Sequence, residues 1–202
     1  MTTITAYDYP LQPHVRRHGP HGYLNYEPFR EWLRDEFSYR CVFCLQREQW
    51  VRLTASFHID HFVPQAIDPT LACDYDNLLY VCAACNSIKS DSEVPNPCEV
   101  GFGECLVVHA NGKIEAKNST GELLIEELRL DDDNLTQYRQ RWLDTWRALI
   151  ASGNLGTYEE WMRYPEDLPD LNAKHPTGNT RPQGIAHSAF EGRRCGELPK
   201  HY

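Results

Sequence analysis

The sequence lacks the features that would place it in a membrane or in an export pathway. No apolar run approaches the roughly 18 residues that a membrane-spanning helix needs, and the first residues do not show the charged and then apolar pattern of a secretory signal. Internal repeats and low-complexity tracts are also missing. A hydrophobic content of 41% in 202 residues is enough for an ordinary core. We therefore expect a soluble, cytoplasmic protein of one compact domain with appendages.

The sequence is also short of positive charge. Its formal net charge of −9 disfavours a free-standing nucleic-acid binder, because the neutralisation of phosphates normally takes a basic surface. Bases are scarce in residues 61–133, whereas they outnumber acids in residues 171–202. A surface that faces phosphate would therefore be local, formed by the two terminal segments and by Lys89.

Eight cysteines are present, but without a secretory signal a disulfide scaffold is disfavoured. Four of them form two Cys-x-x-Cys pairs, Cys41/Cys44 and Cys82/Cys85. Four thiolates give a closed tetrahedral set for Zn²⁺, which is typical of a structural site. A thioredoxin-like redox pair and unpaired buried thiols are the alternatives, and the presence of two pairs favours the metal. The other cysteines are interpreted as ordinary thiols: Cys73, Cys98, Cys105 and Cys195.

The segment between the two cysteine pairs is longer than the roughly 15–20 residues of ordinary zinc ribbons, so it contains an insertion. The insertion holds Asp60 and His61, which point to opposite faces of an extended backbone, and Asn86 follows the second pair. Carboxylate and amide oxygens suit Mg²⁺ or Mn²⁺, and a neutral imidazole nearby can take a proton from water. These residues predict a hydrolytic phosphodiesterase site, although an isolated Asp-His pair is more commonly a hydrogen-bonded surface pair.

The combined pattern resembles the HNH (His-Me finger, ββα-metal) endonuclease family, in the form braced by a four-cysteine zinc site. Several motif blocks occur in the order of the family. These blocks are Cys41-x-x-Cys44, His58-Ile59-Asp60-His61-Phe62-Val63-Pro64, Asn77-Leu78-Leu79, and Cys82-x-x-Cys85-Asn86-x-x-Lys89.

The resemblance implies a role for each matching residue. His61 would be the general base, and Asp60 would bind a catalytic Mg²⁺ or Mn²⁺. Asn77 would brace the loop that orients His61. Asn86 stands where many members have histidine, and members with asparagine there use its amide oxygen on the metal. Lys89 matches a basic position near the scissile phosphate.

The resemblance also implies the reaction and its partners. Members of this kind cut DNA and leave 5′-phosphate and 3′-hydroxyl ends. His58 stands where an acid or a histidine often occurs, and either a supporting role or a satisfied buried histidine fits it. More loosely, the chain is similar to stand-alone bacterial HNH proteins, including those that accompany an ATPase in anti-phage defence. A protein partner would then supply DNA affinity or gate the activity of an acidic nuclease.

Two other functions stay open. A zinc-ribbon module that binds nucleic acid or protein without catalysis would need the cysteines but none of Asp60, His61, Asn77 and Asn86. The presence of all four residues argues against it. A nuclease that is silent until a partner docks is an activity state of the first hypothesis.

Local patterns predict an α+β fold, with a ββα-metal core stapled by the four-cysteine site and extended by a β-hairpin and C-terminal helices. The expected elements are a helix over 27–37, strands over 56–63 and 78–81, a helix that begins at 85, a hairpin about Asn111-Gly112, a long helix from the acids at 131–133 to Ile150, and a helix opened by a capping box at Thr157. The predicted segments are an irregular N-terminal arm (1–24), the HNH core with its zinc site (25–100), a hairpin and helical extension (101–164), and a basic flexible tail (165–202).

Overall fold

The computed structural model describes residues 4–51, 56–175 and 178–202, and they form two compact units. Within these ranges, the core unit contains residues 15–93, 164–200 and Tyr202, and the accessory unit contains residues 4–14, 94–163 and His201. The N-terminal arm is therefore divided between the two units. No helix in the described ranges has both the length and the apolar character to cross a membrane.

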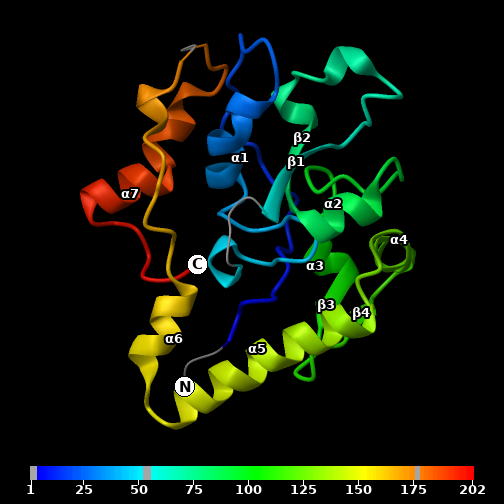
Figure 1. Ribbon diagram of the computed structural model, residues 1–202, viewed down its shortest axis with the longest axis vertical. Coiled ribbons are helices and arrows are strands. Elements are labelled where there is room, and N and C mark those ends of the chain that lie inside the picture. Colours follow the sequence, from blue (N-terminus) through cyan, green and yellow to red (C-terminus); the bar gives the residue numbers. More distant parts are fainter. Residues whose placement is uncertain (1–3, 52–55, 176–177) are drawn as a thin grey trace. The chain divides into compact units, whose positions relative to one another are not determined.

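The centre of the core unit is a two-stranded antiparallel sheet followed by a helix (Figure 1). Its elements are β1 (Phe57–His61), β2 (Leu78–Cys82) and α2 (Ala83–Lys89), with Ile59 opposite Tyr80 in the sheet. This ββα order, with the α+β composition of the whole chain, confirms the predicted fold class. Short 3-10 turns also occur in the core unit: η1 (Glu27–Phe29), η2 (Glu48–Trp50), η4 (Pro69–Leu71), η5 (Tyr75–Asn77), η6 (Leu171–Ala173) and η7 (Pro182–His187).

A further helix, α1 (Arg30–Glu36), contacts both strands, and so does α2. The predicted helix over 27–37 is confirmed, with η1 as its tighter first turn. Trp32 and Leu33 are buried, as the three- and four-residue spacing of the apolar positions predicts. All five residues of β2 are buried, so this strand lies inside the core unit.

Three consecutive charged residues of α1, Arg34, Asp35 and Glu36, are buried. Arg34 donates to the carboxylate of Glu48 through Nε at 3.0 Å and through Nη2 at 2.8 Å. The hydroxyl of Tyr80 donates to the same carboxylate at 2.6 Å. A buried charge is costly unless it is paired and hydrogen-bonded, and this network meets that condition while it ties α1 to β2.

Asp35 and Glu36 hold segments that are distant in the sequence. Nε2 of His18 lies 2.8 Å from Asp35, and the backbone amide of Ala189 donates to the same carboxylate at 2.7 Å. The backbone amides of Arg17 and His18 donate to Glu36 at 2.8 and 3.0 Å. Both terminal segments of the core unit are therefore packed on α1.

The C-terminal segment, expected to be a flexible and solvated tail, has defined structure. It contains α7 (Ala189–Cys195), and it buries Leu168. The guanidinium of Arg181 donates to both carboxylate oxygens of Asp76, at 2.9 and 2.7 Å. Low hydrophobic content does not predict this defined structure, because it comes from contacts to residues far away in the sequence, both apolar (Tyr39) and polar (Asp76).

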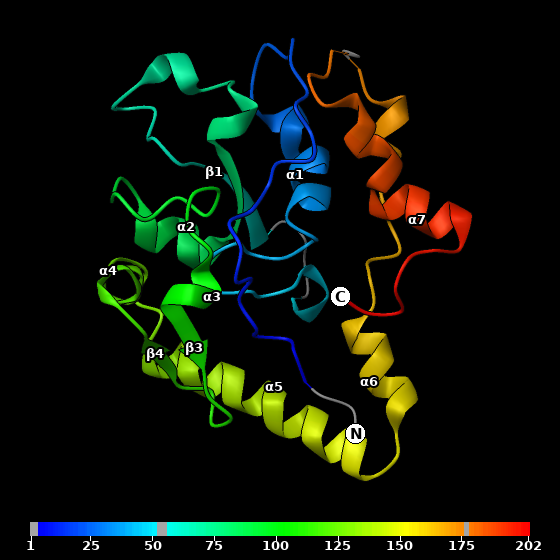
Figure 2. The same ribbon diagram turned by 180° about the vertical axis from the view of Figure 1, so that it is seen from behind.

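The accessory unit is a β-hairpin with helices. Its elements are α3 (Phe102–Cys105), β3 (Leu106–Val108), β4 (Ile114–Ala116), α4 (Ser119–Leu128), α5 (Asp133–Ala151) and α6 (Leu155–Met162). The turn predicted at Asn111-Gly112 is confirmed, since β3 pairs with β4 and Gly112 has a φ of +81°, which glycine tolerates best. Nε of Arg139 donates to the carbonyl of Gly112 at 2.8 Å, so α5 holds the hairpin tip (Figure 2).

Side-chain caps set where the helices of the accessory unit begin. Asp132 caps α5, which confirms the start predicted at the acidic run. Asn118 caps α4, a helix that the sequence analysis did not identify. The capping box predicted at Thr157 is wrong, because Asn154 caps α6 and accepts a hydrogen bond from the amide of Thr157. The helix therefore begins two residues before Thr157.

Replacement of Glu48 by alanine is expected to lower the free energy of unfolding by about 3 kcal/mol, because Arg34 would keep a buried charge without its main partner. Urea unfolding measures this loss. As a control, Glu27→Ala removes an exposed carboxylate from Arg30 and should cost less than about 1 kcal/mol. Similar losses in the two variants would contradict the stabilising role of the buried network.

Candidate active site and metal centre

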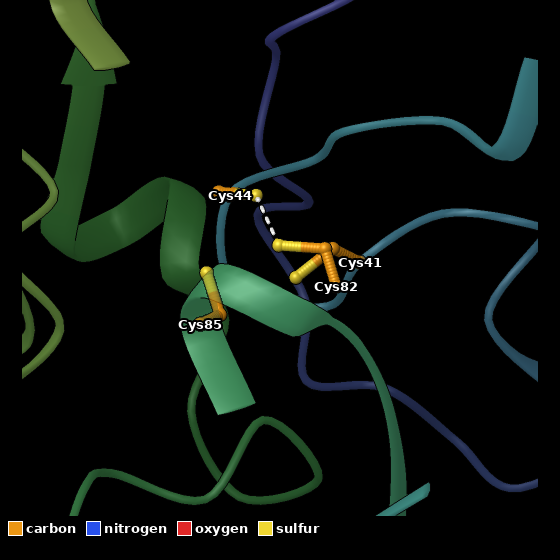
Figure 3. Close-up of side chains that lie close together, drawn as sticks. All are labelled: Cys41, Cys44, Cys82 and Cys85. Carbon is orange, nitrogen blue, oxygen red and sulfur yellow. Dashed lines mark hydrogen bonds between the residues drawn. The ribbon is translucent and has the colours of Figure 1, made fainter. Parts of the chain in front are cut away.

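Four sulfur atoms meet in the core unit (Figure 3). Cys41 and Cys44 lie in a turn before η2, Cys82 ends β2, and Cys85 lies in the first turn of α2. The four atoms lie within 4.8 Å of one another, all four residues are buried, and the Sγ atoms of Cys44 and Cys82 are 3.6 Å apart. This is the predicted group, and the spacing suits tetrahedral Zn²⁺, which takes sulfur ligands at about 2.3 Å.

The first cysteine pair sits on a tight turn that backbone hydrogen bonds close. Leu45 has a φ of +62°, and its amide donates to the carbonyl of Cys41 at 3.0 Å. The amide of Cys41 donates to the carbonyl of Gln46 at 2.8 Å. The amide of Val42 donates to the carbonyl of Tyr80 at 3.1 Å, which attaches the turn to β2. The two pairs are therefore neighbours in space.

The chemistry of the four thiols also favours a cation. Burial raises the pKa of the Cys41 thiol. Hydrogen bonds to the other thiols, above all to Cys41, raise the pKa of Cys85. For Cys82 the hydrogen bonds to the other thiols, again above all to Cys41, lower the pKa. The thiols cannot all ionise on their own, because negative charges this close repel one another. A divalent cation removes that obstacle, so the residues fit a closed zinc site.

His61 is the last residue of β1, and its half-buried imidazole has three neighbours. Nε2 lies 3.0 Å from the carbonyl oxygen of Ala72. A carbonyl can only accept, so in the neutral ring Nε2 carries the proton and Nδ1 the lone pair. The side-chain nitrogen of Gln65 lies 3.2 Å from Nδ1 and 3.0 Å from Nε2, and the ring of Tyr26 meets the imidazole at 4.9 Å and 89°. A neutral imidazole in this tautomer can accept a proton at Nδ1.

Asn77 braces the connection between the two strands. Its Oδ1 accepts from the amide of Val63 at 2.8 Å, and its Nδ2 donates to the carbonyls of Val63 and Leu71 at 3.1 and 3.3 Å. Ala72, whose carbonyl meets the imidazole of His61, directly follows Leu71. The bracing contacts that the resemblance implies for Asn77 are therefore present in the loop.

Asp60 forms a buried ion pair with Lys89. Nζ of Lys89 lies 3.2 Å from Oδ2 of Asp60 and donates to the carbonyl of His61 at 3.0 Å. Burial raises the pKa of Asp60, and the charge of Lys89 opposes this shift. Lys89 is completely buried, so the structure does not present it to a phosphate as the sequence analysis expected. The physical reason is the cost of a buried carboxylate, which an adjacent ammonium reduces.

The remaining predicted residues lie on elements next to Asp60. Asn86 is half-buried on α2, one residue beyond Cys85, and His58 lies two residues before Asp60 on β1 and so shares its face of the strand. Lys89 contacts the carboxylate of Asp60 and the backbone carbonyl of His61 directly. Asn86 and His58 lie on the same elements as these residues, α2 and β1.

The oxygen donors fit a hard cation. Oδ2 of Asp60 is buried, with the ammonium of Lys89 at 3.2 Å, and Asn86 offers a carboxamide oxygen; both are ligand types of Mg²⁺ and Mn²⁺. Within the part of the chain that the structure describes, the four cysteines are the only group of three or more His, Cys, Asp and Glu side chains close enough to share one ion. A second metal would therefore keep waters or phosphate oxygens among its ligands.

Three groups that contact the imidazole of His61 lie outside the set of residues predicted from the sequence. Gln65 directly follows the matching run that ends at Pro64, so its position four residues after His61 was a usable signal. Tyr26 belongs to the N-terminal arm, and Ala72 contributes a backbone carbonyl. Neither of these two leaves a recognisable pattern in the sequence.

The region that holds this site was compared with known protein families. Residues 41–92 match the sequence model of a family described as HNH endonuclease. The match includes both cysteine pairs together with Asp60, His61 and Asn77. It confirms the resemblance stated for this region. No curated protein matches the chain.

Purified protein is expected to hold one tightly bound zinc ion, and Cys82→Ser is expected to lose it and to unfold at a lower temperature, because a structural zinc site contributes directly to folding. Metal analysis and a thermal melt measure the two effects. The control Cys195→Ser changes an exposed thiol and should keep both the zinc and the melting temperature. Full zinc content in Cys82→Ser would contradict the assignment.

Proposed function

We propose that the chain is a divalent-metal-dependent HNH endonuclease that hydrolyses phosphodiester bonds of DNA. The observation that carries this proposal is the 3.0 Å contact between Nε2 of His61 and the carbonyl oxygen of Ala72, since in the neutral ring it assigns the proton to Nε2 and leaves Nδ1 as the basic nitrogen. A module that only binds DNA does not need a histidine held in this way. The HNH match over residues 41–92 supports the nuclease class.

In this proposal His61 is the general base. Its Nδ1 takes a proton from water while the water oxygen bonds to phosphorus. The bond between phosphorus and O3′ breaks, the electron pair leaves with O3′, and that oxygen takes a proton from solvent. The products carry a 5′-phosphate and a 3′-hydroxyl. The hydrogen bond from Nε2 to Ala72 grows stronger as the ring becomes charged, which stabilises the imidazolium.

Asp60 and Asn86 would hold Mg²⁺ or Mn²⁺ through their oxygen atoms. Such an ion, when bound, supplies charge stabilisation for the phosphate and the leaving oxygen. The charge of Lys89, 3.2 Å from Oδ2, favours the ionised form of Asp60. We assign His58 a supporting role on the same face of β1.

The distribution of charge supports a protein partner. Exposed acids of the accessory unit include Glu122, Glu126 and the run Asp131–Asp133, and the whole chain carries −9. Such a surface repels DNA, so an acidic nuclease gains from a partner that supplies DNA affinity or gates the cut. We propose a partner such as an ATPase, in a cytoplasmic bacterial defence or restriction system.

The wild-type protein should nick supercoiled plasmid in the presence of Mg²⁺ or Mn²⁺, alone or with its partner, and chelation should stop the reaction. His61→Ala should lower the rate by about 10²–10⁴-fold, because the general base is lost. His109→Ala changes an exposed histidine of the accessory unit and serves as the control. Gel densitometry over time measures the rates.

The same variants separate the nuclease from a non-catalytic zinc module. The module predicts that Asp60→Ala and His61→Ala keep DNA or protein binding and that no preparation cuts. Cutting that is equal in wild type and His61→Ala would reject the assignment of the base. Cutting that occurs only after a partner is added would identify the gated form.

Asn77→Ala is expected to reduce the cleavage rate by about 10²-fold while zinc content is kept, because the loop that carries Ala72 would lose its brace. Asn77→Asp keeps the acceptor for Val63 but loses both donations, so it should not restore the rate. Asn172→Ala, at an exposed asparagine of the same unit, is the control. A normal rate in Asn77→Ala would show that the loop does not need the brace.

A further inference from the structure

Two side chains outside the predicted set contact the imidazole of His61 directly. The side-chain nitrogen of Gln65 is 3.2 Å from Nδ1 and 3.0 Å from Nε2. The in-plane directions outward from Nδ1 and Nε2 point away from each other. One atom that is nearly equidistant from both nitrogens therefore cannot lie along either of these directions. The amide therefore lies over the face of the ring. In this position it leaves the in-plane direction of Nδ1 open.

Tyr26 makes the second contact. Its ring centroid is 4.9 Å from the imidazole centroid with an interplanar angle of 89°, which is the edge-to-face geometry that aromatic rings prefer. Tyr26 precedes η1, whereas Gln65 follows β1, so the two contacts come from separate segments. Three groups therefore hold the imidazole: the carbonyl of Ala72 at Nε2, the amide of Gln65 over one face, and the perpendicular ring of Tyr26.

We propose that Tyr26 and Gln65 form a clamp that positions the imidazole of His61, so that the N-terminal segment completes the active site. This inference rests on the proposed nuclease function. Both residues act through the imidazole and contact neither the phosphate nor the attacking water in this proposal, so both are positioning residues. The bond to Ala72 alone leaves the ring free to rotate about that hydrogen bond, and two contacts outside the ring plane remove this freedom.

A purely structural role explains these contacts less well. Gln65 is exposed and Tyr26 is only half-buried, so neither belongs to the apolar core of the unit. Tyr23 of the same segment packs on the buried Phe29, whereas Leu24 is 100% exposed, so the residues next to Tyr26 do not share one environment. The contact of Tyr26 with His61 is therefore a local feature of the site.

The expected consequence is kinetic. Alignment of the base with the water that it activates affects the rate, and a misplacement of about 1 Å can cost 10²-fold. Loss of either clamp residue should therefore lower kcat by about 10- to 100-fold and leave KM nearly unchanged, because substrate binding does not use the imidazole.

The test compares Tyr26→Ala, Tyr26→Phe and Gln65→Leu in the zinc-loaded full chain, with Leu24→Ala as the matched control. We expect kcat to fall in Tyr26→Ala and Gln65→Leu, and to be restored in Tyr26→Phe, which keeps the ring. Leu24→Ala should behave as wild type. A fall in Tyr26→Phe equal to that in Tyr26→Ala, or a change in KM alone, would overturn the clamp, since it would assign the effect to the hydroxyl or to substrate binding.

A second measurement does not depend on cleavage. In ¹⁵N-histidine-labelled protein, wild-type His61 should show one protonated and one unprotonated ring nitrogen, and Tyr26→Ala should move the two shifts towards each other as the ring becomes mobile. Unchanged shifts in Tyr26→Ala would overturn the inference even if the enzyme cuts. Changed shifts in a protein that never cuts would keep the clamp and reject the proposed nuclease function.

Discussion

The sulfur atoms of the two cysteine pairs lie together at the ends of the long loop between Cys44 and Cys82, and a cation bound to them would close the loop that carries His61. A two-stranded sheet is marginal by itself, and a seven-residue helix such as α2 is shorter than an isolated helix needs to be in water. A cation held by both cysteine pairs would add its binding free energy to folding and would set the junction of β2 and α2. The helix that begins at this junction, α2, carries Asn86 and ends at Lys89.

A second set of contacts fixes the loop itself. Asn77 bonds to Val63 and Leu71 from inside the loop. From outside, Nη2 of Arg16 donates to the carbonyl of Leu78 at 2.6 Å, next to Asn77. The loop is thus held from two sides. These contacts place the backbone carbonyl of Ala72, which lies in the loop, 3.0 Å from Nε2 of His61.

Local chemistry explains which parts could be predicted. The turn at Asn111-Gly112 and the cap at Asp132 follow from single residues and their neighbours, so the sequence was sufficient for them. The cysteine spacing likewise predicted a cluster that the structure contains. The burial of Lys89 and the contact of Tyr26 with His61 could not be predicted, because each depends on a partner about 30 residues away. The low hydrophobicity of the segment after residue 164 predicted a flexible tail, whereas its structure comes from contacts far away in the sequence, such as Arg181 to Asp76 and Leu168 to the cluster around Tyr39.

The buried charges of α1 bear on specificity more than on stability. A well-packed apolar substitute for a buried ion pair is often as stable as the pair, so Asp35 and Glu36 are not needed merely to fill space. Apolar contacts, however, allow a segment to slide, whereas His18 can meet Asp35 in only one register. Because the segment from Arg17 leads on to Tyr26, the register chosen at α1 also decides whether a ring reaches the imidazole of His61. The pair of His18 and Asp35, which lies outside the proposed active site, would in this way affect the position of the His61 imidazole.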